Sequence, residues 1–289
     1  PTLAFGDGNT GFYESEDNVL RLSQGGSMTV DFGATYVESG TSYSFALKRG
    51  AVGLVDSPTY SFVSDADTGM WRTAANSLGF STQGALRLVV DNNSRISLSN
   101  NDNNTGNTVF GNYAFNAGSD NASDYNVAIG NLAMGTGTVA GATNNVAVGY
   151  KALEDITSAD SNTAIGFLAG TNLTTGGSNT CVGSESLEAA TTASNTVFIG
   201  SRAGEKIPAG LAIEYVTAVG AQAFEGDSSN TSALTTQTTA IGGKALKSLT
   251  TGDGNTAVGY QAGTAITTGQ YNTAIGYDSL KLLTTGESN

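Results

Sequence analysis

The sequence predicts an all-β protein: an elongated homotrimeric fibre in which two small β modules precede a parallel β-helix of about ten 17-residue coils. Three observations predict it. A short repeat recurs ten times in residues 105–289, a different repeat occurs twice in the first 104 residues, and glycine accounts for 39 of 289 residues against 3 prolines. Such a chain lacks large side chains for one thick core, yet has too many spaced apolar residues for disorder. A repeat fold with a thin core continued along one axis needs few large side chains and still buries the spaced apolar residues.

The longer repeat is defined by a column of glycines. Five of the nine steps between successive glycines have the same length, 17, and the others measure 19, 19, 20 and 22, so the basic coil is a 17-residue unit. Glycine at a turn supplies a positive φ or room for close backbone approach. The turn glycines are Gly111, Gly130, Gly149, Gly166, Gly183, Gly200, Gly220, Gly242, Gly259 and Gly276.

The residue before each glycine is always apolar. In the motif Asn-Thr-Ala-Ile-Gly, strand alternation places Thr and Ile on one face and Ala and Gly on the other. We expect the apolar column to point into the thin core. Its members are Phe110, Ile129, Val148, Ile165, Val182, Ile199, Val219, Ile241, Val258 and Ile275.

Three residues after each glycine the chain always has Ala or Ser. Such small residues predict a second face that another chain approaches closely, so we expect several chains side by side, most naturally three, although other closed symmetries remain open. The members of this column are Ala114, Ala133, Ala152, Ala169, Ser186, Ala203, Ala223, Ala245, Ala262 and Ser279.

The asparagine of each repeat is expected to bond backbone at a turn and to stack in a ladder. The longer coils carry insertions near residues 117–124, 135–143, 205–214 and 225–236. Because surface turns tolerate insertions and strands do not, these segments should bulge from turns and leave the stack unbroken.

The first part of the chain contains a different duplication. Thr10-Gly-Phe-Tyr13 matches Thr68-Gly-Met-Trp71, and Asn18-Val-Leu20 matches Asn76-Ser-Leu78 at the same offset along the chain. The sequence therefore predicts one β module at 1–57, its duplicate at 58–104, and a repeat shaft at 105–289 that continues beyond the end of this chain.

Composition excludes many functions. The chain has no histidine and one cysteine, so histidine zinc sites, Ser-His-Asp triads and Cys-His pairs cannot form. We expect no enzyme activity, no catalytic residue, no cofactor and no metal, although carboxylate-only chemistry survives this argument. The net charge of −13 without a basic stripe argues against nucleic acid, and the lack of a long apolar run argues against membrane insertion.

Several side chains allow a functional interpretation beside an ordinary one. Phe12, Tyr13, Met70 and Trp71 could form a sugar platform, but aromatic residues mostly serve burial. Cys181 is expected to be a small buried filler. The carboxylate groups lack a calcium-loop pattern, and no pair recurs as glycoside hydrolysis would need. These groups are Asp65/Asp67, Asp120/Asp124 and Glu225/Asp227.

The repeat also resembles known families. Asn272-Thr-Ala-Ile-Gly-Tyr277, closed by Thr284-Thr-Gly286, resembles the head repeats of YadA-type trimeric autotransporter adhesins, although the 17-residue period exceeds their shorter coil. Asn255-Thr-Ala-Val-Gly-Tyr-Gln-Ala262 is more similar to repeats of phage tail fibres, which often precede an endosialidase-type intramolecular chaperone. This resemblance covers about residues 105–289. The pattern of the first modules also resembles modules of phage tail fibres and spikes.

These resemblances imply a structural protein of a virion: a rigid trimeric tail-fibre shaft that supports host-cell attachment. The implied partners are copies of the chain itself, other tail or fibre proteins, and a glycan or protein of the host surface. The alternative is a head or stalk domain of a bacterial trimeric adhesin at the cell surface. An ice-binding solenoid is less favoured, because adjacent threonines face opposite sides of a strand and the insertions would interrupt a flat array.

Overall fold

The structure is a computed structural model that describes residues 56–62, 64–73, 77–90, 106–115, 122–136, 139–230 and 237–289 in full. Elsewhere it describes the backbone of the strands named below. The described part of the chain is all-β and contains no helix. The chain divides into two compact units, residues 1–100 and 101–289.

The first unit is an antiparallel meander in which each strand pairs with the next along the chain. Its strands are β1 (Leu3–Ala4), β2 (Gly11–Glu16), β3 (Val19–Gln24), β4 (Ser27–Phe32), β5 (Tyr36–Ser39), β6 (Phe45–Lys48), β7 (Tyr60–Phe62), β8 (Asp65–Ala74), β9 (Ser77–Thr82), β10 (Ala85–Val90) and β11 (Ile96–Leu98).

Strand pairing repeats along this meander with the same offset as the sequence duplication. Gly11 pairs with Ser23 in β2 and β3, and Gly69 pairs with Ser81 in β8 and β9. The same bulge follows in both pairs, and β10 pairs with β9 as β4 pairs with β3. The two segments therefore share one backbone plan as well as a sequence pattern.

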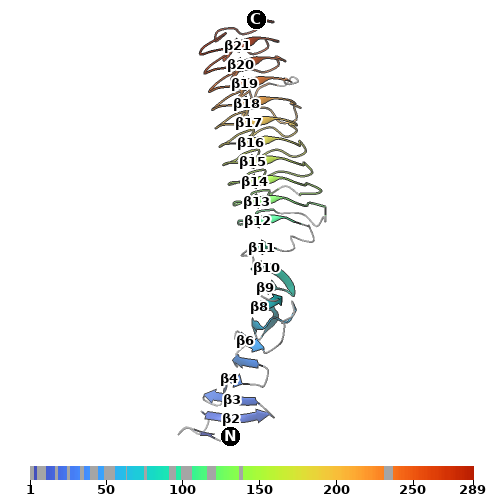
Figure 1. Cartoon of the computed structure of the whole chain (residues 1–289), viewed down its shortest axis with the longest axis vertical. Coiled ribbons are helices and arrows are strands. Elements are labelled where there is room, and N and C mark those ends of the chain that lie inside the picture. The colour runs from blue at the N-terminus through green and yellow to red at the C-terminus, as the bar shows by residue number, and fades with distance from the viewer. Residues whose placement is uncertain are drawn as a thin grey trace. The chain divides into compact units, whose positions relative to one another are not determined.

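The second unit is a parallel β-solenoid with one three-residue strand from each of ten coils (Figure 1). Each strand pairs with the next at equivalent positions, so the chain stacks in register. The strands are β12 (Thr108–Phe110), β13 (Val127–Ile129), β14 (Val146–Val148), β15 (Thr163–Ile165), β16 (Thr180–Val182), β17 (Val197–Ile199), β18 (Thr217–Val219), β19 (Thr239–Ile241), β20 (Thr256–Val258) and β21 (Thr273–Ile275).

The strands alternate as predicted, but the assignment of faces was wrong. In β15 the middle residue Ala164 is fully buried, while Ile165 is 41% exposed and Thr163 is half-buried. In β13–β21 the middle residue is likewise buried and its two neighbours are half-buried or exposed, so the predicted core column points away from the interior of its own chain. The outward column is Phe110, Ile129, Val148, Ile165, Val182, Ile199, Val219, Ile241, Val258 and Ile275.

The Ala/Ser column was misplaced in the same way. Eight of its members, from Ala133 to Ala262, are completely buried inside the chain, so they form part of the core and face no partner. The reason is the narrowness of a 17-residue coil: the strand wall and the opposite wall are close, so most coils have small side chains there. Phe198 is the large exception, and Gly204 beside it leaves room for its ring. Larger apolar groups enter the core from the corners, as Leu153, Ile156 and Leu173 do.

The turn glycines have both properties expected from the sequence, a positive φ and a close approach to neighbouring backbone. Their φ values lie between +116° and +144°, a region that other residues avoid. Space is also lacking, because a Cβ on Gly166 would lie 2.5 Å from the carbonyl oxygen of Gly183 in the next coil. Glycine stacks on glycine, and a side chain would separate the coils.

The predicted asparagine ladder is confirmed. Asn162 donates its backbone N–H (2.9 Å) and its Nδ2 (3.1 Å) to the Oδ1 of Asn145, and its Nδ2 also donates to the carbonyl of Gly176. Asn179 bonds Asn162 in the same way. The ladder is interrupted in three successive coils, where Thr196, Val216 and Thr238 replace asparagine.

The stack is unbroken at every described insertion, as expected. Strands β13 and β14 stay in register across the 135–143 segment, and β17 and β18 stay in register across 205–214. The proposed ranges were too wide, however, because Val139, Ala142, Ile207 and Ile213 within them are core residues. Residues 116–121 and 231–236 lie outside the described part of the chain.

The corrected faces change which substitution should unfold a coil. Ala164→Asp places a carboxylate in a closed apolar interior, and burying an unpaired charge costs several kcal/mol. We expect loss of β-sheet circular dichroism or a much lower urea midpoint. Ser158→Asp, at an exposed turn of the preceding coil, is the control and should change the stability by less than about 0.5 kcal/mol. Equal midpoints for the two variants would contradict the inward position of Ala164.

Candidate functional site

The most distinctive surface of the solenoid is the outward side of β12–β21, here called the outer strand face. Two columns form it: the apolar column given above and the first residue of each strand. The first residues are Thr108, Val127, Val146, Thr163, Thr180, Val197, Thr217, Thr239, Thr256 and Thr273. All are Thr or Val, so neither column contains a charged side chain.

This face is uncharged, with one apolar column, and it is open in the single chain. Ile129, Ile165, Ile199 and Ile241 are 37–41% exposed, although each is flanked by neighbouring strands. Parallel sheets are normally covered on both faces, and a large contiguous apolar patch on a protein surface usually marks an interaction site. The outer strand face is therefore the candidate binding surface of this unit.

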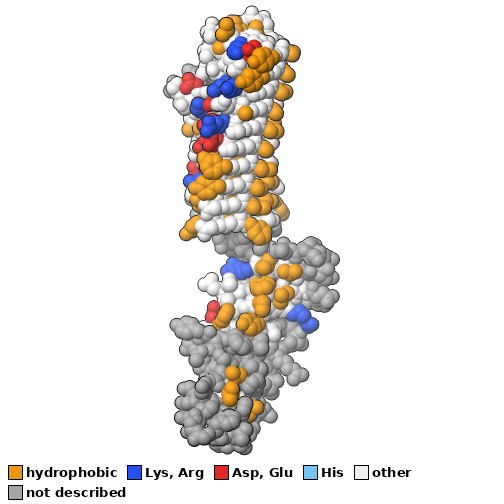
Figure 2. Space-filling view, turned by 90° about the vertical axis from the view of Figure 1, so that its left-hand side faces the viewer, with side chains coloured by type: hydrophobic (Ala, Val, Ile, Leu, Met, Phe, Trp, Pro, Cys, Tyr) orange, Lys and Arg blue, Asp and Glu red, His pale blue; other side chains and the backbone are white. Residues whose placement is uncertain are grey.

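Charged side chains gather elsewhere on the coil. Many occupy the columns two and five residues after each glycine. In the view of Figure 2 a row of hydrophobic groups runs along one side of the solenoid, and the charged groups gather on the other side, where some hydrophobic groups also lie. The residues in those two columns are Lys151, Glu154, Glu185, Glu188, Arg202, Glu205, Glu225, Lys244, Lys247, Asp278 and Lys281.

Aromatic side chains also form axial stacks. Tyr150 and Phe167 stack with ring centroids 5.6 Å apart, and Tyr260 and Tyr277 do the same at 5.6 Å. All four directly follow the glycine column, so they are neighbours of the outer strand face in sequence. Because these rings cover one another, they make a poor flat platform for a sugar.

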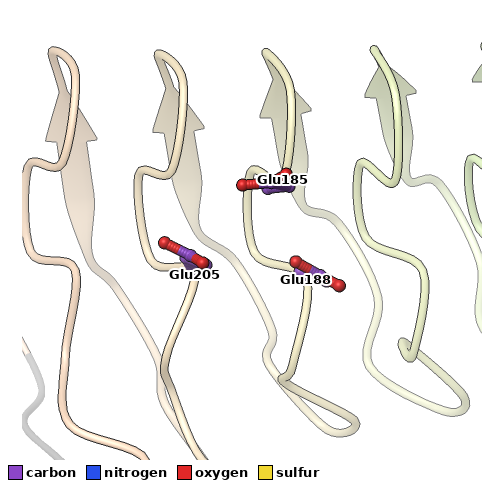
Figure 3. A group of neighbouring side chains, drawn as sticks. All are labelled: Glu185, Glu188 and Glu205. Atoms are coloured by element: carbon purple, nitrogen blue, oxygen red, sulfur yellow. The ribbon is translucent and has the colours of Figure 1, made fainter.

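One group of carboxylates has the spacing of a metal site. Glu185, Glu188 and Glu205 each offer an oxygen, and these oxygens all lie within 4.8 Å of one another. Glu185 and Glu188 belong to one coil and Glu205 to the next (Figure 3). Oxygen ligands of this kind suit a hard divalent cation.

A positively charged side chain of the protein already pairs with these carboxylates. Arg202 Nε donates a 2.7 Å hydrogen bond to Glu185 and lies 3.8 Å from an oxygen of Glu205. Burial, and then repulsion from Glu185 and Glu205, raises the pKa of Glu188. The arrangement is a partly neutralised carboxylate stack. The sequence analysis missed it because Glu188 and Glu205 are a whole coil apart in the chain, yet both stand five residues after a glycine, and that shared column was the available signal.

A second charged group crosses three coils. Glu225 is 2% exposed, and its carboxylate oxygens lie 2.6 Å from Nζ of Lys206 and 3.0 Å from Nζ of Lys247. Burial alone would raise the pKa of Glu225, but hydrogen bonds from the two lysines lower it. We call these three residues the lysine clamp; the two lysines neutralise the carboxylate, and Gln222 Nε2 also donates to it at 3.3 Å.

The other carboxylates considered from the sequence do not converge with these groups. Asp227 accepts hydrogen bonds from the backbone and hydroxyl of Ser229. At the start of β8, Asp65 is exposed and Asp67 is half-buried, and a hydrogen bond with Asp65 raises the pKa of Asp67. Asp120 lies outside the described residues.

The remaining singled-out side chains behave as packing groups where they are described. Met70 and Trp71 are half-buried in β8, while the side chains of Phe12 and Tyr13 lie outside the described residues. Cys181 is fully buried, and burial raises the pKa of its thiol to about 12. Because the thiolate is the reactive form, Cys181 is chemically silent in the folded chain.

The fold defines the class of this protein: a repeat protein whose parallel β-solenoid follows an antiparallel β-sheet. No protein-family model matches the chain, and no curated protein or solved structure matches it significantly. Among the described residues there is no helix with the length and hydrophobicity to cross a membrane.

The carboxylate stack predicts an opposite response of two neighbours. Because the raised pKa of Glu188 opposes folding once the unfolded chain has ionised, Glu188→Gln should raise the Tm at pH 7. The gain in Tm should disappear below about pH 4.5, the ordinary pKa of a glutamate carboxyl, because Glu188 is then protonated in both the folded and the unfolded chain. Glu185→Gln removes the partner of Arg202 and should lower the Tm at pH 7. Thermal melts between pH 4 and 8 test both, and a lower Tm for Glu188→Gln at pH 7 would contradict the assignment.

Proposed function

We propose that this chain is a structural segment of a viral tail fibre, in which three copies form a rigid shaft that supports attachment to a host cell. The observation that carries the proposal is the outer strand face, a surface that is uncharged on all ten coils and β-branched from β13 to β21. Such a surface suits permanent burial against another protein, and its regular repetition suits a rod.

A second and third copy of the chain are the occupants that fit best. Each copy carries a net charge of −13, so copies brought together through charged surfaces would repel one another. The outer strand face has no charged residue in its two columns, and ten strands at about 4.8 Å give it a length of ~48 Å. Three such faces can meet around an axis parallel to the stack, which is a closed arrangement.

The assignment to a virion rests on resemblance. The repeats resemble those of phage tail fibres and of bacterial trimeric adhesins, and the duplicated antiparallel module favours the fibre, because it resembles modules of phage fibres and spikes. The bacterial adhesin is the alternative with the same assembly. In either case we assign length and stiffness to the solenoid, and place contacts with other fibre proteins and with a host glycan or protein elsewhere on the assembly.

The assembly can be tested by light scattering on the purified chain. We expect a particle of three times the 29.2 kDa chain mass. Ile165→Asp should shift the particle toward monomer without loss of β-sheet circular dichroism, because the change charges the outer strand face and spares the interior. Ser158→Asp is the matched control and should remain trimeric. A stable wild-type monomer would refute the proposal.

The shaft role can be tested by removing whole coils. Deletion of residues 255–288 removes two coils and joins Gly254 to Asn289, which occupies the same repeat position as Asn255. The complete fibre should stay trimeric and become about 10 Å shorter. Adsorption to the native host should weaken while the host range stays the same. A changed host range would show that these coils carry the receptor site.

A further inference from the structure

The apolar column of the outer strand face alternates in size. From β13 to β21 it runs Ile129, Val148, Ile165, Val182, Ile199, Val219, Ile241, Val258 and Ile275, with no exception. These residues are direct partners in successive parallel pairs, as Ile165 is with Val148 and with Val182. Phe110 in β12 precedes the alternating series.

Nothing inside the chain imposes this alternation. The buried middle column is alanine in most coils, with Cys181 and Phe198 in adjacent strands. The other outward column has runs of one residue type, such as Thr217, Thr239 and Thr256. The alternating side chains point away from the core, so the core accepts either residue at each position.

The alternation gives the face a corrugated profile. The isoleucines are exposed, whereas Val148, Val182, Val219 and Val258 are half-buried at the same strand position. Each isoleucine extends one methylene beyond its valine neighbours. The face therefore has a ridge on every second coil, with a period of about 9.6 Å, twice the spacing of neighbouring strands.

We propose that this corrugation fixes the axial register of the copies that pack on the outer strand face. The inference rests on the trimer proposed above. When three copies are level, layers of three isoleucines alternate with layers of three valines, and the larger groups extend toward the room left by the smaller layers. A copy displaced by one coil puts unlike residues in every layer, which leaves gaps in some places and crowds others.

A register device meets a need of this fold. Coils of nearly identical chemistry can pair almost equally well after a shift, and repetitive strands are prone to such slippage. With a uniform column, a one-coil shift would lose contacts only at the two ends. With the alternating column, the same shift disturbs every layer from β13 to β21.

The test uses a phase-inverted chain, in which Ile and Val are exchanged at the eight positions from Ile129 to Val258. This exchange keeps the composition and leaves the interior unchanged. Wild-type and inverted chains, one carrying a charged tag, are co-expressed and their trimers are separated by ion exchange. Random assembly would place about three quarters of the trimers in mixed species. We expect the mixed fraction to fall about ten-fold, which corresponds to ~1.4 kcal/mol.

A chain with valine at all nine positions is the control, and it should mix with wild-type and inverted chains equally. Circular dichroism confirms that each chain is folded. If wild-type and inverted chains both form trimers but mix at random, the register inference is overturned and the trimer stands. If no chain forms an oligomer, the proposed function fails instead. Segregation of the inverted chain, with free mixing of the all-valine chain, supports the inference.

Discussion

In-register stacking of equivalent residues is the constraint on which the solenoid depends. Each position of a coil lies about 4.8 Å from the same position of the next coil. A column must therefore contain residues that can pack against identical side chains. Asparagine does so, because one amide donates to the next, as Asn162 does to Asn145. Glycine does so because it has no Cβ. Glutamate tolerates a like neighbour only with a cation nearby, which Arg202 supplies.

The sequence was sufficient for the period, the strands, the glycine turns and the amide ladder, because each follows from local chemistry repeated along the chain. It was insufficient for deciding which face of a strand lies inside. Alternation in Thr163-Ala164-Ile165 is symmetrical, and the usual rule that larger apolar groups are buried led to the wrong side. The deciding quantity is the width of the coil, which depends on how its corners fold. Leu153 and Ile156 fill most of that width from the corners, and Ala164 completes it.

The charged groups show a related limit. Carboxylates were compared within short segments such as Asp65 and Asp67, whereas stacking brings together residues that are a whole coil apart. Once residues are grouped by column, Glu188, Glu205, Glu225 and Lys247 form a continuous series. Their side-chain pairing still could not be read from the columns, because Lys206 reaches Glu225 from a different position of its coil.

The lysine clamp crosses the region where the amide ladder is interrupted. Lys206, Glu225 and Lys247 come from three successive coils, and Val216 and Thr238 stand nearby in sequence in place of ladder asparagines. Hydrogen bonds between side-chain amides are insensitive to salt and to mild acid. An ionic contact, in contrast, weakens as salt screens it or as its carboxylate gains a proton. A rod built in this way is not uniform along its length: salt or acid would weaken the side-chain contacts between these coils, while the amide ladders on either side would keep theirs.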